Sequence, residues 1–169
     1  MHSTKRTTPV RQPVHELHRL GDVMDELLDA LVELEQRAHR ASNHYDTEPW
    51  QGENFARDLP GKRELSLIAT VSGKPVGFLI ASRRPEGAHI HRLATDPGHR
   101  GIGVASRLLA ALLANTPGSV TLVCDPLNQP ALALYARAGL RVTGTTPEGK
   151  LSLATGTAPH RRAFPERKK

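Results

Sequence analysis

One stretch, from a predicted strand into a predicted helix, constrains the fold of this chain more than any other. Alternating residues over 88–96 predict a strand, and apolar residues recur at helical spacing from Val104 onward. Arg100, Gly101 and Gly103 lie between these elements. The first turn of a helix has free backbone N–H groups and the positive end of the helix dipole, so it binds anions. The two glycines, which have no Cβ, allow a phosphate to approach the main chain closely.

The glycine loop and the residues before it resemble the pyrophosphate-binding signature of the GNAT N-acyltransferases, which use acetyl-CoA. The segments that match the family pattern are Leu93-Ala94-Thr95-Asp96-Pro97 and Arg100-Gly101-Ile102-Gly103. The resemblance implies that the pyrophosphate binds to Arg100, Gly101, Ile102, Gly103, Val104, Ala105 and Ser106. It also implies that the backbone of Leu93, Ala94 and Thr95 binds pantetheine and polarises the thioester carbonyl. A glycine-rich turn without a ligand is the alternative, and it leaves the clustered arginine and glycines unexplained.

A second motif lies about 25 residues farther along the chain. Asn128, Ala131, Tyr135 and Gly139 match the family pattern N-x-x-A-x-x-x-Y-x-x-x-G-F, with Leu140 in place of the usual Phe. The resemblance implies that Asn128 binds the pantetheine arm and that Tyr135 protonates the leaving thiolate. The two residues are seven positions apart, about two helical turns, and therefore share a helix face. The alternatives are an N-cap role for Asn128 and core packing for Tyr135.

The residue that removes the proton from the acceptor amine is the least defined part of the predicted site. Histone acetyltransferases of the GNAT family have a catalytic Glu four residues before the position of Leu93, and His89 stands there in this chain. We expect His89 to be the base, with a pKa near the ordinary value for histidine, and His91 to be the next candidate. His89 and His91 have the same parity as Leu93, which predicts that the three share a strand face. The spacing of the histidines indicates no metal site, and Cys124 is expected to be a buried strand residue.

Residues 14–155 are expected to form one α/β (α+β) domain, with basic, disordered tails at 1–13 and 156–169. Asp22 is the predicted N-cap of a helix that ends near His39, and a second helix is predicted from Pro49 to Leu59. The other expected elements are strands 14–20, 64–71, 75–82 and 88–95, a helix to residue 115, strand 119–124, a helix ended by Gly139, and strands 140–145 and 151–154. This order resembles the GNAT fold and implies a mixed, mostly antiparallel central sheet with helices on both faces.

The net charge of +6 belongs to the tails and not to the predicted domain. Residues 1–13 carry +3 and residues 159–169 carry +4, which leaves −1 for the residues between them. A duplex-binding domain would carry its basic residues on the folded face, so at most a weak RNA contact through the tails is indicated. The single cysteine, the absence of an apolar leader and the absence of an apolar run of roughly 18 residues favour a cytoplasmic protein without a membrane segment.

A further likeness concerns the first two predicted helices. Residues 34–39, Pro49-Trp50 and Phe55 resemble the N-terminal helices of ribosomal-protein alanine acetyltransferases. Those enzymes have a base Glu five residues before the motif Asn, where this chain has Val123, so their acceptor is not carried over. The resulting hypothesis is an acetyl-CoA-dependent N-acetyltransferase that acts on an unidentified primary amine. The alternatives are a degenerate domain that binds acyl-CoA as a sensor or partner module, and a tail-anchored enzyme that acetylates an RNA-bound amine. A homodimer is left open.

Overall fold

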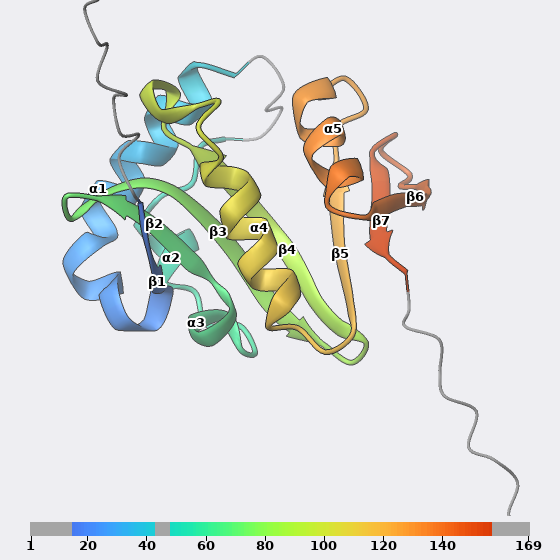
Figure 1. Ribbon diagram of the computed structural model, residues 1–169, viewed down its shortest axis with the longest axis horizontal. Coiled ribbons are helices and arrows are strands. Elements are labelled where there is room, and N and C mark those ends of the chain that lie inside the picture. Colours follow the sequence, from blue (N-terminus) through green and yellow to red (C-terminus); the bar gives the residue numbers. More distant parts are fainter. Residues whose placement is uncertain (1–14, 43–47, 157–169) are drawn as a thin grey trace, which may run out of the picture.

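The computed structural model describes residues 15–42 and 48–156 (Figure 1). Seven strands form one sheet in the order β1-β2-β3-β4-β5-β7-β6. All neighbouring strands are antiparallel except β4 and β5, which run parallel. Helix α4 covers one face of the sheet and α1 covers the other (Figure 1). This mixed, mostly antiparallel sheet with helices on both faces confirms the expected fold class.

The described elements follow the expected order, with short additions. The strands are β1 (Glu16–Arg19), β2 (Leu67–Val71), β3 (Lys74–Arg84), β4 (Gly87–Thr95), β5 (Ser119–Cys124), β6 (Leu140–Thr145) and β7 (Leu151–Thr155). The helices are α1 (Leu20–Arg40), α2 (Gly52–Ala56), α3 (Lys62–Leu65), α4 (Val104–Ala114) and α5 (Gln129–Arg137), and a 3-10 turn covers Pro97–His99. The tails expected at 1–13 and 156–169 lie outside the described residues, except for Gly156.

Helix α1 begins three residues earlier than predicted. Arg19 occupies the N-cap position, and Asp22 lies in the first turn, where its negative charge faces the positive end of the helix dipole. Strand β1 runs directly into the helix, and the N–H of Leu20 donates to the carbonyl of Ser66 at 2.9 Å. The Asp22 cap was therefore a wrong prediction, because tertiary pairing set the start of the helix.

The segment between α1 and β2 also differs from the prediction. Helix α2 ends at Ala56 instead of Leu59, and α3 is an additional turn that begins after Gly61, whose φ is 65°. The buried Lys62 ammonium donates to the backbone carbonyls of Asn54, Phe55 and Arg57 at 2.8, 2.7 and 2.8 Å. These bonds satisfy carbonyls at the end of α2, so the helix needs no further turn. Strand β2 starts at Leu67 and not at residue 64.

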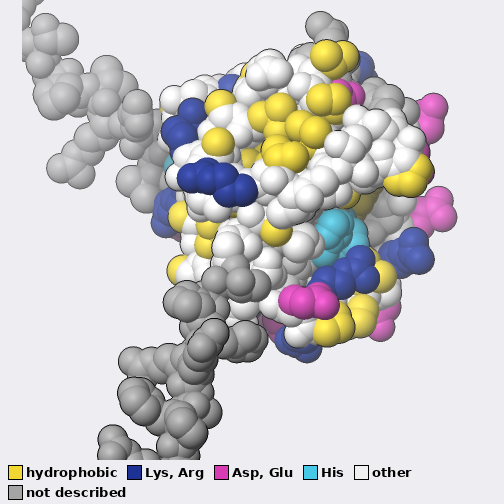
Figure 2. Space-filling view, turned by 90° about the vertical axis from the view of Figure 1, so that its right-hand side faces the viewer, with side chains coloured by type: hydrophobic (Ala, Val, Ile, Leu, Met, Phe, Trp, Pro, Cys, Tyr) yellow, Lys and Arg dark blue, Asp and Glu magenta, His cyan; other side chains and the backbone are white. Residues whose placement is uncertain are grey.

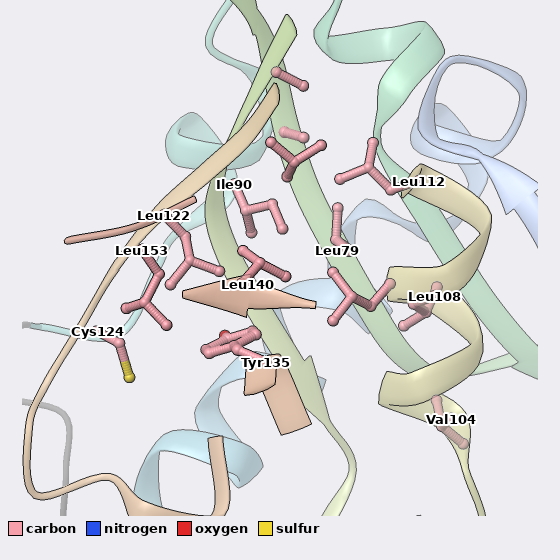
Figure 3. Close-up of a cluster of buried hydrophobic side chains, with 14 of the residues drawn as sticks. Leu79, Ile90, Val104, Leu108, Leu112, Leu122, Cys124, Tyr135, Leu140 and Leu153 are labelled. Atoms are coloured by element: carbon pink, nitrogen blue, oxygen red, sulfur yellow. The ribbon is translucent and has the colours of Figure 1, made fainter. Parts of the chain in front are cut away.

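Two apolar clusters lie on opposite faces of the sheet. On one face the helix α4 residues pack against β3, β4 and β5 through Leu79, Ile90, Val104, Leu108, Leu112 and Leu122 (Figure 3). On the other face α1 packs over Phe55 and Phe78, whose rings meet edge to face at 5.1 Å between centroids. Both layers fix the position of β4, the strand that ends at the candidate site.

Candidate active site

Strands β4 and β5 separate where the site begins. Their parallel pairing covers Gly87–Ile90 against Ser119–Leu122 and then stops. From residue 91 to Thr95, β4 continues without β5 beside it, and the strands diverge toward their C-terminal ends (Figure 1). Backbone groups on that edge of β4 are available to a ligand, and Leu93, Ala94 and Thr95 line the cleft that opens there.

The glycine loop forms the start of α4, as the sequence predicts. Gly103 is the N-cap residue with φ of 85°, and Gly101 has φ of 77°. A Cβ at either position would meet no atom within 4 Å, so both glycines face open space. At the entrance to this loop, Asp96 accepts hydrogen bonds from Arg37 at 2.8 Å and His99 at 2.9 Å. Burial alone would raise the pKa of the Asp96 carboxyl, but these two bonds lower it.

Helix α5 forms the opposite wall. The Asn128 side chain accepts a hydrogen bond from the N–H of Ala131 at 3.3 Å, so it is an N-cap, and it also lines the cleft. Tyr135 is 8% exposed and packs near Leu140 and Cys124 (Figure 3). Tyr135 also lines the cleft. Its side chain therefore packs in the core and faces the cleft at the same time.

These three walls enclose a cleft of about 990 Å³ between β4, α4 and α5. Most of the site residues named from the sequence line it: Leu93, Ala94, Thr95, Arg100, Gly101, Gly103, Val104, Ala105, Ser106, Asn128 and Tyr135. Ile102 and His89 do not line the cleft, whereas His91 does. Ile102 instead packs against the apolar cluster under α4.

The histidines do not share a strand face with Leu93, contrary to the parity argument. The register between β3 and β4 shifts after Ile80, because His91 is an extra residue in β4, and a bulge of this kind reverses the alternation of side chains. Leu93 therefore packs toward α4. His89 lies opposite Ser82 on the other face, and the His89 and His91 ring centroids are 5.0 Å apart.

The two imidazoles are bound by hydroxyl groups. His89 Nδ1 lies 2.8 Å from Thr121 Oγ1, and His91 Nε2 lies 2.7 Å from Ser82 Oγ. Burial and the Arg84 charge lower the pKa of His89 below 6.5, and burial together with neighbouring cationic groups lowers the pKa of His91 to about 4. Both rings are therefore neutral near pH 7 and can accept a proton.

A buried ion pair under the site was not found from the sequence. The Arg92 guanidinium, whose side chain is 9% exposed, pairs with the fully buried Glu35 of α1. The Arg92 charge lies 5.8 Å from the centroid of the Trp50 ring, and the backbone N–H of Trp50 donates to Glu35 Oε1 at 3.2 Å. Glu35 occupies a core position of the amphipathic helix α1. An acidic residue at such a position in the sequence could have predicted a buried cationic partner.

Other lining residues follow no motif. Arg137 and Lys150 bring two cationic groups to the cleft from the end of α5 and from the segment before β7. Cys124 also lines it, and burial raises the pKa of its thiol to about 11, so the thiol is protonated and a poor nucleophile. Within residues 15–42 and 48–156, no three or more metal-ligating side chains gather together, and no helix is long and apolar enough to cross a membrane.

Residues 28–140 match the model of the Acetyltransferase (GNAT) family. The protein ML0378 of Mycobacterium leprae is 30% identical over 133 residues, which are 76% of this chain and 36% of that protein. The peptidyl-lysine N-acetyltransferase YjaB of Salmonella typhimurium is 27% identical over 118 residues, 69% of this chain and 78% of that enzyme. This chain thus spans about a third of the first relative and most of the second.

A solved structure supports the fold. The ribosomal-protein-S18-alanine N-acetyltransferase from Escherichia coli superposes with a TM-score of 0.68 at 23% identity, over 89% of this chain and 100% of that one. The likeness of the first two helices to this class of enzyme therefore extends over the whole domain as a likeness of fold.

Proposed function

The chain belongs to the acetyltransferase (GNAT) family, and we propose that it transfers an acetyl group from acetyl-CoA to a primary amine by direct attack of the amine on the thioester. The observation that carries this proposal is the convergence of three walls on one cleft: the free edge of β4, the glycine loop before α4, and the Asn128–Tyr135 face of α5. Each wall provides one requirement of acyl transfer from a thioester.

The glycine loop supplies the site for the pyrophosphate. Positive φ at Gly101 and Gly103 exposes main-chain N–H groups at the start of α4, where the helix dipole favours negative charge. Arg100 and Arg137 add cationic groups to the same cleft. The pantetheine arm would then lie along Leu93–Thr95, toward the end of the cleft that contains His91.

In the proposed mechanism, the neutral amine attacks the carbonyl carbon of the thioester and forms a tetrahedral oxyanion. A free backbone N–H at the end of β4 donates to that oxyanion. The carbon–sulfur bond then breaks, and Tyr135 donates its proton to the departing thiolate. His89 lies beside His91 and outside the lining of the cleft, so it takes the proton from the amine through a water. The proton arrives on Nε2, with Nδ1–H donating to the Thr121 hydroxyl.

Two measurements test this function. Calorimetry is expected to show binding of acetyl-CoA, and a thiol assay is expected to show release of free CoA when amines, polyamines, aminoglycosides or peptides are added. Peptides with lysine belong in this set because the relative YjaB is a peptidyl-lysine N-acetyltransferase. Binding without release for every acceptor would refute the enzyme and favour an acyl-CoA-binding module. The cytoplasmic location, the homodimer and the RNA contact of the tails remain predictions, of which the last requires salt-dependent RNA binding.

A further inference from the structure

A group of cationic side chains surrounds the two histidines on the face of the sheet away from α4. Ser82 of β3 pairs with His89 of β4, and Arg84 pairs with Gly87. Directly opposite residues of antiparallel strands share a face, so Arg84 lies diagonally next to His89. Gly87 has no side chain, which leaves the exposed Arg84 without a cross-strand side chain opposite it.

Two further cations come from the connection between α2 and α3. Lys62 is 3% exposed, and its three bonds to backbone carbonyls hold the segment 54–57 in place. The N–H of Arg83 donates to the carbonyl of Pro60 at 2.6 Å and fixes the same connection to β3. The charges of Arg84, Lys62 and Arg57 all lower the pKa of His91, in agreement with the position of Arg84 on the face of His89 and the attachment of the α2–α3 segment to β3. We call Arg57, Lys62 and Arg84 the cationic cluster.

No member of the cationic cluster forms a salt bridge with a carboxylate among the described residues. The ion pairs of those residues involve His18, Arg37, Arg92 and His99 instead. The Asp58 charge acts to raise the pKa of Lys62 but forms no salt bridge with it, and no carboxylate acts on the pKa of His91. Figure 2 shows a histidine side chain at the surface with Lys and Arg side chains next to it, and Asp or Glu side chains lie beside these cations. The cationic cluster adjoins the cleft through His91.

We propose that the acceptor is an amine that carries an anionic group, a carboxylate or a phosphate, which binds to Arg84 and Arg57 while the amine reaches His91 and the end of β4. The inference rests on the proposed acetyl transfer and names the substrate class of that site. Guanidinium groups bind both kinds of anion with paired N–H donors. The same cations disfavour an ammonium at His91, so they promote the neutral amine that attacks the thioester.

The test compares acceptors that differ only in the anionic group. β-Alanine is paired with β-alaninamide, and phosphoethanolamine with ethanolamine, and kcat/KM is measured by release of free CoA. We expect the anionic member of at least one pair to be preferred by roughly tenfold or more, since hydrogen bonds to charged groups contribute on this scale. The two pairs distinguish a carboxylate site from a phosphate site. The preference is expected to decrease with salt, because Arg57 and Arg84 are exposed.

The double substitution Arg57→Gln with Arg84→Gln is expected to reduce that preference to near one while acetyl-CoA affinity is kept. The matched control is Arg19→Gln, which removes an exposed arginine from β1 at the far edge of the sheet. The control is expected to keep the preference. Equal use of the charged and neutral members by the wild type, or an unchanged preference in the double variant, would overturn the proposal.

A binding measurement separates this proposal from the proposed function. If no amine is acetylated, the enzyme is refuted, and anion binding is read directly from the imidazole NMR signals of His89 and His91 in the CoA-loaded protein. Titration with β-alanine or phosphoethanolamine is expected to saturate, and titration with the neutral partner is not. Absence of saturation with both anionic compounds, or saturation that persists in the double variant, would refute the cationic cluster as the anion site.

Discussion

The substitution Gly103→Asp tests the phosphate site with the fewest side effects on the fold. Gly103 is the N-cap of α4 with φ of 85°, and an added Cβ would meet no protein atom within 4 Å. The Cβ of the new side chain therefore clashes with nothing in the domain. It occupies the space at the helix N-terminus where the pyrophosphate is expected to lie.

The expected magnitudes separate strain from lost binding. A non-glycine residue at this positive φ costs about 1–2 kcal/mol, which lowers the melting temperature by about 2–8 °C for a domain of this size. A lost hydrogen bond to a charged group costs about 1.5–3 kcal/mol, and the added carboxylate repels the phosphates, although exposure screens this repulsion. A total of about 3 kcal/mol weakens acetyl-CoA binding by about a hundredfold.

Gly73→Asp is the matched control. Gly73 has φ of 76° in the turn between β2 and β3, has no atom within 4 Å of an added Cβ, and does not line the cleft. Both variants are expected to lose similar melting temperature, and only Gly103→Asp is expected to lose affinity in isothermal titration calorimetry. Wild-type affinity in Gly103→Asp would refute the assignment of the phosphate site to this loop.

Three other predictions address the chemistry and the ends of the chain. Tyr135→Phe is expected to lower kcat about tenfold or more, with little change in the KM for acetyl-CoA, because the phenol acts only as the thiolate leaves; an unchanged kcat with chemistry rate-limiting would leave it as core packing. The base must be neutral, so kcat/KM should rise with pH through the lowered pKa of His89, below 6.5, and stay flat above it. His89→Gln is expected to abolish this rise of kcat/KM with pH and to lower kcat/KM by roughly a hundredfold. An unaltered pH profile would indicate that His91 is the base instead. Deletion of residues 1–13 and 159–169 should leave the melting temperature and acetyl-CoA affinity nearly unchanged. A large decrease in the melting temperature would show that one of these tails packs against the domain.

The cofactor side of the site could be predicted from the sequence because it is built from contiguous segments. Arg100, Gly101 and Gly103 lie within four positions, and their backbone conformation depends on local glycine content and on the start of a helix. Asn128 and Tyr135 share one short helix. Such short motifs determine the local backbone conformation, so they can be recognised in the sequence. In the structure all five residues line one cleft.

The acceptor side could not be predicted in the same way, because tertiary structure sets its geometry. One extra residue at His91 reverses the parity of β4, so a rule of strict alternation places Leu93 on the wrong face relative to the histidines. The buried Lys62 ended α2 early and created α3, although nothing in the local pattern marks Lys62 as buried. Both features depend on contacts between separate elements of the folded chain.

The same contrast explains why the acceptor is harder to identify than the acetyl donor. A backbone cradle binds any phosphate of suitable shape, so its requirements are met by glycines and a helix N-terminus. The cationic cluster combines side chains from the α2–α3 connection and β3 around a histidine of β4. Arg57 and Arg84 can change without disturbing the sheet, because both are exposed. Specificity for the amine therefore lies in charges that only the folded chain brings together, and the proposed anionic acceptor follows from their placement.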